Sequence, residues 1–484
     1  MVHITTLPRE ILGAIFEYLE PDSRLSPKKD LLCCIQVCRL WYDLATASLY
    51  RRIWVYIAST PVKKDAIRNL FSNAQASQVR YLYVLITSGG HIYETQQQCD
   101  EMVEYIKKTI SMIEATKNLR LVDLDLCAFT PPDSISSLQP FLLAANNHFI
   151  SLTRTISAKK ANLRLRLSRP DIMAEAQVER ACHPVFNKIV TESSGRLMSL
   201  SVGCPLSWLV TWLRTNPQLH ELNYTKTSAS ESYETEDFWE LIQSSKLQNL
   251  MLDGIDFPGI QKLPIGLVEL ILTRLQDTSF ATKAILTRLP NLRILSLRWG
   301  KTMDKDGQLC ISDGKIVSQG LRKAWWTFSL VPTGTIMAVS KACVFLESLS
   351  LPRNVTNQDL FVISQTANWL TEVWIMDCPG LTIPGVLFLK ALKRLRHLQL
   401  QKSLSEFLSN ENLTTFVAEC NTLSQVTLVF ENSQDETRRR QALLDKISGP
   451  ISYNSVLTRA STFLPSTLGD RMTFNIKIIR GLIV

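Results

Sequence analysis

The stretch that decides the architecture stands near the N-terminus: Leu7-Pro8-Arg9-Glu10-Ile11-Leu12, followed further along by Val37-Cys38-Arg39-Leu40-Trp41. Pro8 suits the first turn of a helix, where its missing N–H is not needed, and Glu10 stands where the helix dipole favours an anion. Apolar residues then recur at the spacing of one helical face: Leu12, Ile15, Phe16 and Leu19, widened by Ile11.

Two further short helices follow this first one. Asp30 can cap a helix over residues 31–37, and the next helix has an apolar face made of Trp41, Leu44, Ala45 and Leu49. A unit of this size hides only roughly 60% of the surface that its chain exposes. Part of its apolar surface should therefore face a partner or the rest of the chain.

The order of these residue types resembles an F-box over roughly residues 3–53, although residues 22–29 lengthen the first connection. The resemblance implies docking on the Skp-type linker subunit of a cullin-RING ubiquitin ligase of the SCF type. Carried over position by position, the family's linker-binding residues are Leu7, Pro8, Ile11, Leu12, Ile15, Phe16, Leu19, Leu32, Val37, Cys38 and Trp41. A plain helical cap on a larger domain is the alternative interpretation of the same segment.

The composition describes a folded chain with an ample core, because 45% of the 484 residues are hydrophobic and 20% are charged. No run approaches 18 uninterrupted apolar residues, and Pro8, Arg9 and Glu10 interrupt any apolar signal core. We expect no membrane partner and a cytoplasmic or nuclear location. The eleven cysteines then belong in a reducing compartment, where disulfides are rare.

The formal net charge of +9 raises the question of an anionic partner. Lys and Arg are scattered along the sequence, and the tight cluster at residues 438–440 falls in a helix predicted over residues 435–447. We interpret it as a solvated helix face, with nuclear localisation or phosphate binding as the alternative. No aromatic-plus-basic motif of an RNA-binding type accompanies it, so we expect no nucleic-acid partner.

From about residue 79 onward the chain repeats an apolar-x-x-apolar-x-apolar pattern. The first residues of the repeats are Val79, Leu121, Leu197, Leu219, Leu247, Leu267, Leu292, Leu346, Leu370, Leu395 and Leu423. A period of about 20 to 29 residues with one short strand per repeat is typical of leucine-rich repeats. We therefore predict an α/β fold: an N-terminal three-helix F-box, then a horseshoe solenoid with parallel strands on the concave face and helices on the convex face.

The predicted domains are an F-box at 3–53, a helical linker at 54–78 and a divergent leucine-rich-repeat solenoid at 79–484. An insertion is expected near 301–340, followed by an atypical repeat whose Trp325 and Trp326 we place in the core. A C-terminal strand over 474–479 either closes the solenoid or returns to its concave groove.

The cysteines occupy recurrent positions in the repeats: Cys127, Cys204, Cys343, Cys378 and Cys420. Residues 370–382 resemble the cysteine-containing subclass of leucine-rich repeats found in F-box proteins, and the whole chain is most similar to fungal proteins of that type. Small buried thiols explain these positions, since a zinc site needs paired ligands at short spacing. Residues 304–307 are similar to the start of a calcium-binding loop, but the remaining ligands of such a loop are missing. We expect no metal and no cofactor.

No hydrolase elbow, phosphate loop or metalloprotease helix is present in the sequence, so we predict a chain that is not itself an enzyme. As an adaptor it would hold a target protein on the concave face and place it near a conjugating enzyme brought by the cullin and RING subunits. The candidate target-binding residues are Met251, Ile271, Arg298, Trp374, Met376 and Gln399. Trp374 serves as the anchor in this hypothesis, and its packing under an insertion is the alternative.

Two other functions stay open at this stage. The first is an F-box and leucine-rich-repeat scaffold that binds its linker outside ubiquitination. The second is a solenoid whose basic balance serves nucleic acid, which a steep loss of affinity with salt would reveal.

Overall fold

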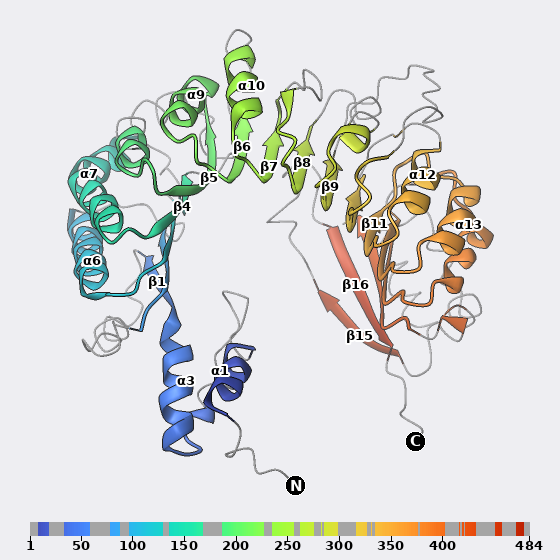
Figure 1. The fold of residues 1–484 in the computed structure, drawn as a ribbon, viewed down its shortest axis with the longest axis horizontal. Helices are drawn as coiled ribbons and strands as arrows, with labels where there is room; N and C mark the ends of the chain where they lie inside the picture. The colour runs from blue at the N-terminus through green and yellow to red at the C-terminus, as the bar shows by residue number, and fades with distance from the viewer. Residues whose placement is uncertain are drawn as a thin grey trace. The chain divides into compact units, whose positions relative to one another are not determined.

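The computed structural model (Figure 1) divides into two compact units, Met1–Lys246 and Leu247–Val484. Each unit is described by itself. The structure describes residues 8–18, 33–58, 78–87, 96–128, 135–167, 186–226, 235–255, 262–274, 282, 285–298, 316–326, 331, 334–375, 378–401, 416, 419–420, 422–431, 451–456 and 471–478.

The first unit begins with helices α1 (Arg9–Tyr18) and α3 (Arg39–Arg51), with a short helical turn at residues 33–37 before α3. Leu12, Phe16 and Ala45 are fully buried between the helices, and the ring of Phe16 meets the ring of Trp41 edge-on at 5.2 Å. This contact between the predicted apolar faces holds α1 against α3. Asp30, the predicted cap of the second helix, lies outside the described residues.

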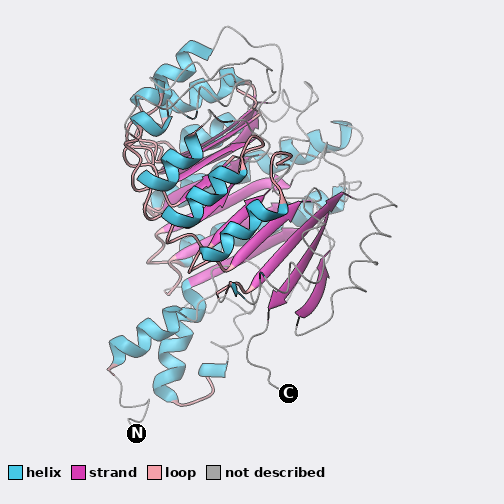
Figure 2. Ribbon diagram, turned by 90° about the vertical axis from the view of Figure 1, so that its right-hand side faces the viewer, coloured by secondary structure: helices cyan, strands magenta, loops and turns pink. Residues whose placement is uncertain are grey.

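The strands of the first unit pair in parallel and in chain order: β1 (Arg52–Ala58), β2 (Tyr81–Thr87), β3 (Leu121–Ala128), β4 (Asn162–Leu167), β5 (Leu197–Cys204) and β6 (Glu221–Lys226). One face of these strands is covered by helices, as Figures 1 and 2 show: α6 (Gln96–Ala115), α7 (Ile135–Ala158), a helix over residues 186–192, α9 (Leu206–Thr215) and α10 (Thr235–Ser244). The alternation of strand and helix is that of leucine-rich repeats.

The second unit repeats the same plan. Its parallel strands are β7 (Asn249–Asp253), β8 (Glu269–Thr273), β9 (Ile294–Arg298), β10 (Lys323–Trp325), β11 (Ser348–Ser350), β12 (Glu372–Ile375), β13 (His397–Gln401) and β14 (Gln425–Glu431). The helices between them are α12 (Thr335–Ala342), α13 (Asn357–Thr366), α14 (Ile383–Leu387) and the 3₁₀ helix η3 (Phe388–Ala391). β16 (Arg471–Ile478) pairs antiparallel to β14, and β15 (Ile451–Val456) pairs antiparallel to β16.

Alternate side chains along each strand have different surroundings. In β7 and β8 the leucines are buried, while the residues between them are half-buried. Because successive side chains of a strand point to opposite faces, the leucines face the helices and the others form the open face of the sheet. The predicted motif is therefore the core of each repeat, and the open face is the surface available to a partner.

The repeat in β3 is shifted relative to the prediction. Val122 and Leu124 are fully buried and pair with the buried Leu82 and Val84 of β2, whereas Leu121 is half-buried. The motif therefore starts at the buried Leu119 instead of Leu121. Five apolar residues, Leu119, Leu121, Val122, Leu124 and Leu126, make both frames possible in the sequence.

Three further features differ from the sequence-based expectations. Residues 54–58 belong to strand β1 instead of a helical linker, because α3 continues directly into the sheet. Trp326 is fully buried as predicted, but Trp325 is half-buried, because the two neighbours point to opposite faces of β10. The predicted C-terminal strand is present as β16, and it pairs antiparallel instead of adding one more parallel repeat. The predicted helix over 435–447 lies outside the described residues.

Candidate partner-binding surfaces

The N-terminal helices present apolar side chains to solvent. Ile11 is 50% exposed and Ile15 is 37% exposed on α1, while Val37 before α3 is 56% exposed. Pro8 and Cys38 are exposed as well. Such a group of exposed apolar side chains on so small a unit is typical of interaction surfaces.

Leu12 and Phe16 occupy a different place from the one predicted for them. Both are fully buried against Ala45, so in this arrangement they support the helices and do not reach a partner. Trp41 is partly buried on the same cluster. This corrects the predicted contact set: the period of α1 puts positions 12 and 16 on the inner face and positions 11 and 15 beside it. Leu7, Leu19 and Leu32 lie outside the described residues.

The open face of the second unit carries the candidate target-binding residues. Met251 and Ile271 are half-buried neighbours on β7 and β8, and Trp374 is the neighbour of Gln399 on β12 and β13. Arg298 ends β9, which lies three strands from β12, so Arg298 and Trp374 are not neighbours on this face. Met376 lies outside the described residues.

Trp374 has an aromatic partner that the sequence analysis placed in the core. Its indole ring stacks on that of Trp325 with centroids 5.9 Å apart and planes 14° from parallel. Ser350 of β11 pairs with both tryptophans and is fully buried between their strands. Nε1 of Trp374 is buried, and no acceptor for it is found among the described residues. The pair gives the open face a large apolar feature.

A polar network continues from this aromatic pair. Nε1 of Trp325 donates to Oγ of Ser348 at 3.0 Å, and that hydroxyl donates to Oε2 of Glu372 at 3.0 Å. Next to Glu372 stands His397, whose Nε2 is 2.8 Å from Oγ1 of Thr427. Burial lowers the pKa of His397, and the charge of Glu372 partly opposes that shift. The imidazole is therefore held neutral on this face at neutral pH.

Arg298 is anchored within its own strand. Its Nε donates to Oγ of Ser296 at 3.0 Å, and burial lowers the pKa of its guanidinium group. Ser296 itself is fully buried, so the guanidinium group of Arg298 is held by a residue that a partner does not reach.

The comparisons with known proteins bear on the N-terminal helices. The model of the F-box-like family matches residues 4–55. That range includes α1, α3 and all the exposed apolar residues described above. The N-terminal part of this chain is an F-box-like domain. The parallel strands and helices that follow it in the two units have the architecture of a leucine-rich-repeat solenoid.

The chain has only weak similarity to solved structures. The chain is similar to the crystal structure of the Rad7 and Elc1 complex in yeast, with 12% identity, 81% of this chain and 88% of that chain covered, and a TM-score of 0.43. It is similar to endo-glycoceramidase II from Rhodococcus sp., captured as the lactosyl-enzyme intermediate, with 9% identity, coverage of 88% and 97%, and a TM-score of 0.15. No curated protein matches the chain.

The F-box-like domain also exposes a residue that the sequence analysis missed. Tyr42 on α3 is 52% exposed, one helical turn after the exposed Cys38. The spacing of four residues would have placed the two side chains on one face.

The described cysteines fit the structural role expected for them. Cys204, Cys343, Cys378 and Cys420 are buried, and the Sγ atoms of Cys343 and Cys378 donate to the backbone oxygens of Ser318 and Pro352, each at 3.3 Å. The side chain of Cys127 lies outside the described part of the structure. No cluster of metal-ligating side chains occurs among the described residues, and none of their helices is long and apolar enough to span a membrane.

Proposed function

We propose that this chain is the substrate-recognition adaptor of an SCF-type cullin-RING ubiquitin ligase. The F-box-like domain docks on a Skp-type linker, which brings the cullin and RING subunits, and the open face of the repeats holds a target protein. The chain acts by position: it raises the effective concentration of target lysines near a conjugating enzyme and supplies no catalytic group of its own. Its place of action is the cytoplasm, the nucleus or both.

The observation that carries the proposal is the exposed apolar surface of the F-box-like domain. Ile11, Ile15 and Val37 are exposed although the helices already possess a core of their own. Tyr42 adds an aromatic ring of the type that dominates binding hot spots. Burial of this apolar surface against a partner is favourable, because it removes the side chains from water.

The aromatic pair supports target binding on the open face. Trp325 and Trp374 together offer a rigid apolar platform for a target. With Met251, Ile271, Arg298 and Gln399 this face combines apolar and polar contacts, as binding interfaces do.

The test is a pull-down of the full chain with a purified Skp-type linker. The double variant Ile11→Glu/Ile15→Glu places two charges in the proposed interface and should weaken binding at least about tenfold. Ile265→Glu is the matched control, because Ile265 is 65% exposed in the second unit. Binding that the control keeps and the double variant loses supports the proposal. A folded native chain that does not bind the linker contradicts it.

A scaffold that binds its linker outside ubiquitination is the second candidate, and the F-box-like domain serves it equally well. Addition of the cullin and RING subunits, conjugating enzyme and ubiquitin separates the two. Transfer of ubiquitin to a protein held on the open face supports the ligase adaptor, whereas stable binding without transfer supports the scaffold.

A further inference from the structure

The strands β1 to β5 of the first unit begin with a row of cationic residues. The backbone N–H of Arg80 donates to the oxygen of Arg51 at 3.0 Å, and that of Arg120 donates to the oxygen of Arg80 at 2.8 Å. Further along, the N–H of Leu163 in β4 donates to the oxygen of Arg196 at 2.8 Å. Residues far apart in the sequence therefore stand side by side at the edge where these strands start.

Lysines of the adjoining turns extend this row. Lys117 and Lys160 are both exposed, in the turns that lead into β3 and β4. Arg120 is exposed too, while Arg80 and Arg196 are half-buried. We call Arg80, Lys117, Arg120, Lys160 and Arg196 the basic edge. These five cations are scattered in the sequence, and the repeat brings them together.

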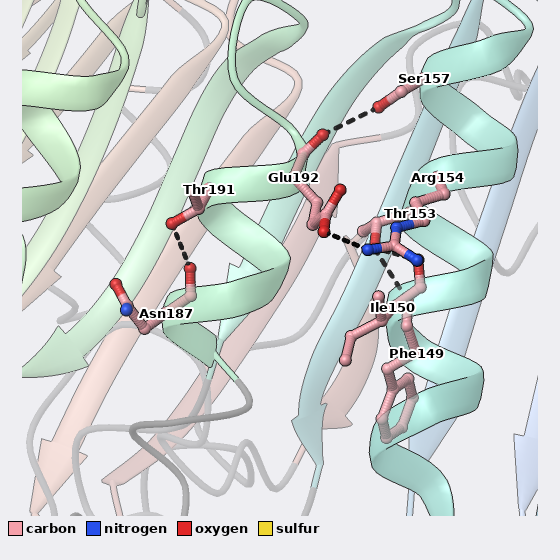
Figure 3. Close-up of polar contacts among 8 residues, drawn as sticks. All are labelled: Phe149, Ile150, Thr153, Arg154, Ser157, Asn187, Thr191 and Glu192. Carbon is pink, nitrogen blue, oxygen red and sulfur yellow. Dashed lines mark hydrogen bonds and ion pairs between the residues drawn. The ribbon is translucent and has the colours of Figure 1, made fainter.

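The cations of the basic edge are not neutralised by the part of the chain that the structure describes. There, none of the five makes an ion pair. Glu192 lies in the same region, but its carboxylate is already paired with Arg154 on α7, which donates to it at 2.7 Å (Figure 3). The pair raises the pKa of Arg154 through the hydrogen bond to Glu192 and lowers the pKa of that carboxyl. Glu114 is exposed near these turns, and its backbone oxygen accepts a hydrogen bond from Nζ of Lys159.

The second unit has a shorter row of cations at the same position before its strands. There the N–H of Arg322 donates to the backbone oxygen of Arg293 at 2.8 Å, and the side chain of Arg322 pairs with Glu347 at 3.0 Å. Arg396 stands there between Thr371 and Ser424, both uncharged. Like charges gathered without counter-charges repel one another, so the arrangement in the first unit calls for a partner of opposite charge.

The neighbouring open face already balances one of its cations. Asp123 and Asp125 of β3 are buried and lie 3.7 and 3.6 Å from the guanidinium group of Arg166 on β4. Arg166 therefore has counter-charges of its own, unlike the cations of the basic edge.

The aromatic rings of this face favour a polypeptide over a nucleic acid. Trp54 stacks on Tyr83 with centroids 3.8 Å apart, and the guanidinium of Arg52 lies over the ring of Tyr81 at 5.6 Å. Each contact uses a ring face on which a base would otherwise stack. Arginine forks, by contrast, match carboxylates directly.

We propose that the basic edge binds an extended, acidic segment of the target protein. This rests on the proposed function, in which the repeats hold a target, and it names the chemistry of the segment. Strands β2 to β5 cover roughly 14 Å at the usual strand spacing, the length of about four or five residues of extended chain. A short run rich in Glu and Asp matches that length and charge.

The test is the binding of a fluorescent peptide of about ten residues rich in Glu to the full chain, followed by anisotropy. Arg80→Glu/Arg120→Glu should weaken binding about tenfold or more, and affinity should fall as salt rises from about 50 to about 200 mM. The matched control is Arg293→Glu/Arg396→Glu, since both residues are exposed before strands of the second unit and the change in charge is the same. The control should alter affinity less than about twofold.

Two further arms keep the test decisive. Arg80→Gln/Arg120→Gln removes the charges without adding repulsion, and it should lose affinity while its thermal melting stays native. A single-stranded oligonucleotide of equal charge is the rival probe. Equal losses in the control variant, or tighter binding of the oligonucleotide through the same arginines, overturn the proposal.

The linker pull-down on the same variants separates this proposal from the proposed function. A chain that keeps its linker but loses the acidic peptide on substitution of Arg80 and Arg120 supports both. If the native chain binds the peptide through the basic edge and never the linker, the adaptor proposal fails while the acidic-segment site stands. If it binds the linker and not the peptide, the acidic-segment proposal fails while the adaptor proposal stands.

Discussion

Trp325 and Trp374 stack on each other although a whole strand separates them. Their ring centroids are 5.9 Å apart, closer than roughly twice the strand spacing that separates their backbones. Ser350 on the intervening strand makes this approach possible, because its small side chain leaves the space above it to the two indoles. The open face of the second unit is therefore built around a pair of rings that depends on one small residue.

Trp325→Ala removes the stacked partner of Trp374 and the hydrogen bond from Nε1 to Ser348. We expect the free energy of unfolding to fall by roughly 1 to 3 kcal/mol, since the ring is half-buried. Denaturation of the full chain followed by circular dichroism measures the change. Val344→Ala is the control, because Val344 is 51% exposed, and it should cost less than about 0.5 kcal/mol. Equal stability of Trp325→Ala and the native chain would show that the stack is incidental.

Thr356→Ala removes the cap of α13. Oγ1 of Thr356 accepts from the N–H of Asp359 at 3.3 Å, and the N–H of Thr356 donates to the carboxylate of Asp359 at 2.9 Å. Loss of such a reciprocal cap costs about 1 kcal/mol of stability. The same denaturation experiment tests it, with Gln358→Ala as the exposed control in the first turn. An equal effect of both substitutions would mean that the cap contributes nothing.

The repeats could be predicted from the sequence because each carries its own local signal. The leucines at Leu250, Leu252 and their counterparts are buried as the spacing indicated. Strand β1 escaped prediction because it follows α3 without a turn, so Arg52–Ala58 was divided between the F-box and a linker. The burial of Trp325 was predicted wrongly, because two adjacent tryptophans suggested a core position for both, whereas neighbouring side chains of a strand point to opposite faces.

The basic edge could not be predicted from local patterns. Arg80 and Arg120 lie in different repeats, and only the parallel register of β2 and β3 puts them side by side. Similarly, the division of α1 into buried Phe16 and exposed Ile15 depends on where α3 packs. Contacts between repeats join residues that are far apart in the sequence, so the order of residue types does not predict them.

The buried thiols should resist modification in the native chain. Burial raises the pKa of Cys343 to about 12, so this thiol stays protonated and unreactive at neutral pH. Treatment with iodoacetamide followed by peptide mass mapping should label the exposed Cys33 and Cys38 first, and Cys343 only after denaturation. Rapid labelling of Cys343 in the native chain would contradict its burial.

The raised pKa of Cys343 also predicts a loss of stability in alkali. The folded chain favours the protonated thiol, so this contribution is complete below the ordinary thiol pKa of 9.0. It is lost as the pH rises from there towards about 12. Cys343→Ala should therefore show a shallower alkaline decline in melting temperature than the native chain.

His397 predicts the opposite dependence on the acid side. Burial lowers its pKa in the folded chain, while the unfolded chain keeps the ordinary value of 6.5. The unfolded state therefore takes up a proton first as the pH falls, and stability that is present above pH 6.5 is lost below it. The melting temperature of the native chain should decline on acidification, and His397→Gln should decline less, because glutamine does not titrate. Thr427→Val, which removes the hydroxyl 2.8 Å from Nε2 but keeps the histidine, should retain the native slope. Identical slopes for the native chain and His397→Gln would assign the acid loss to other groups.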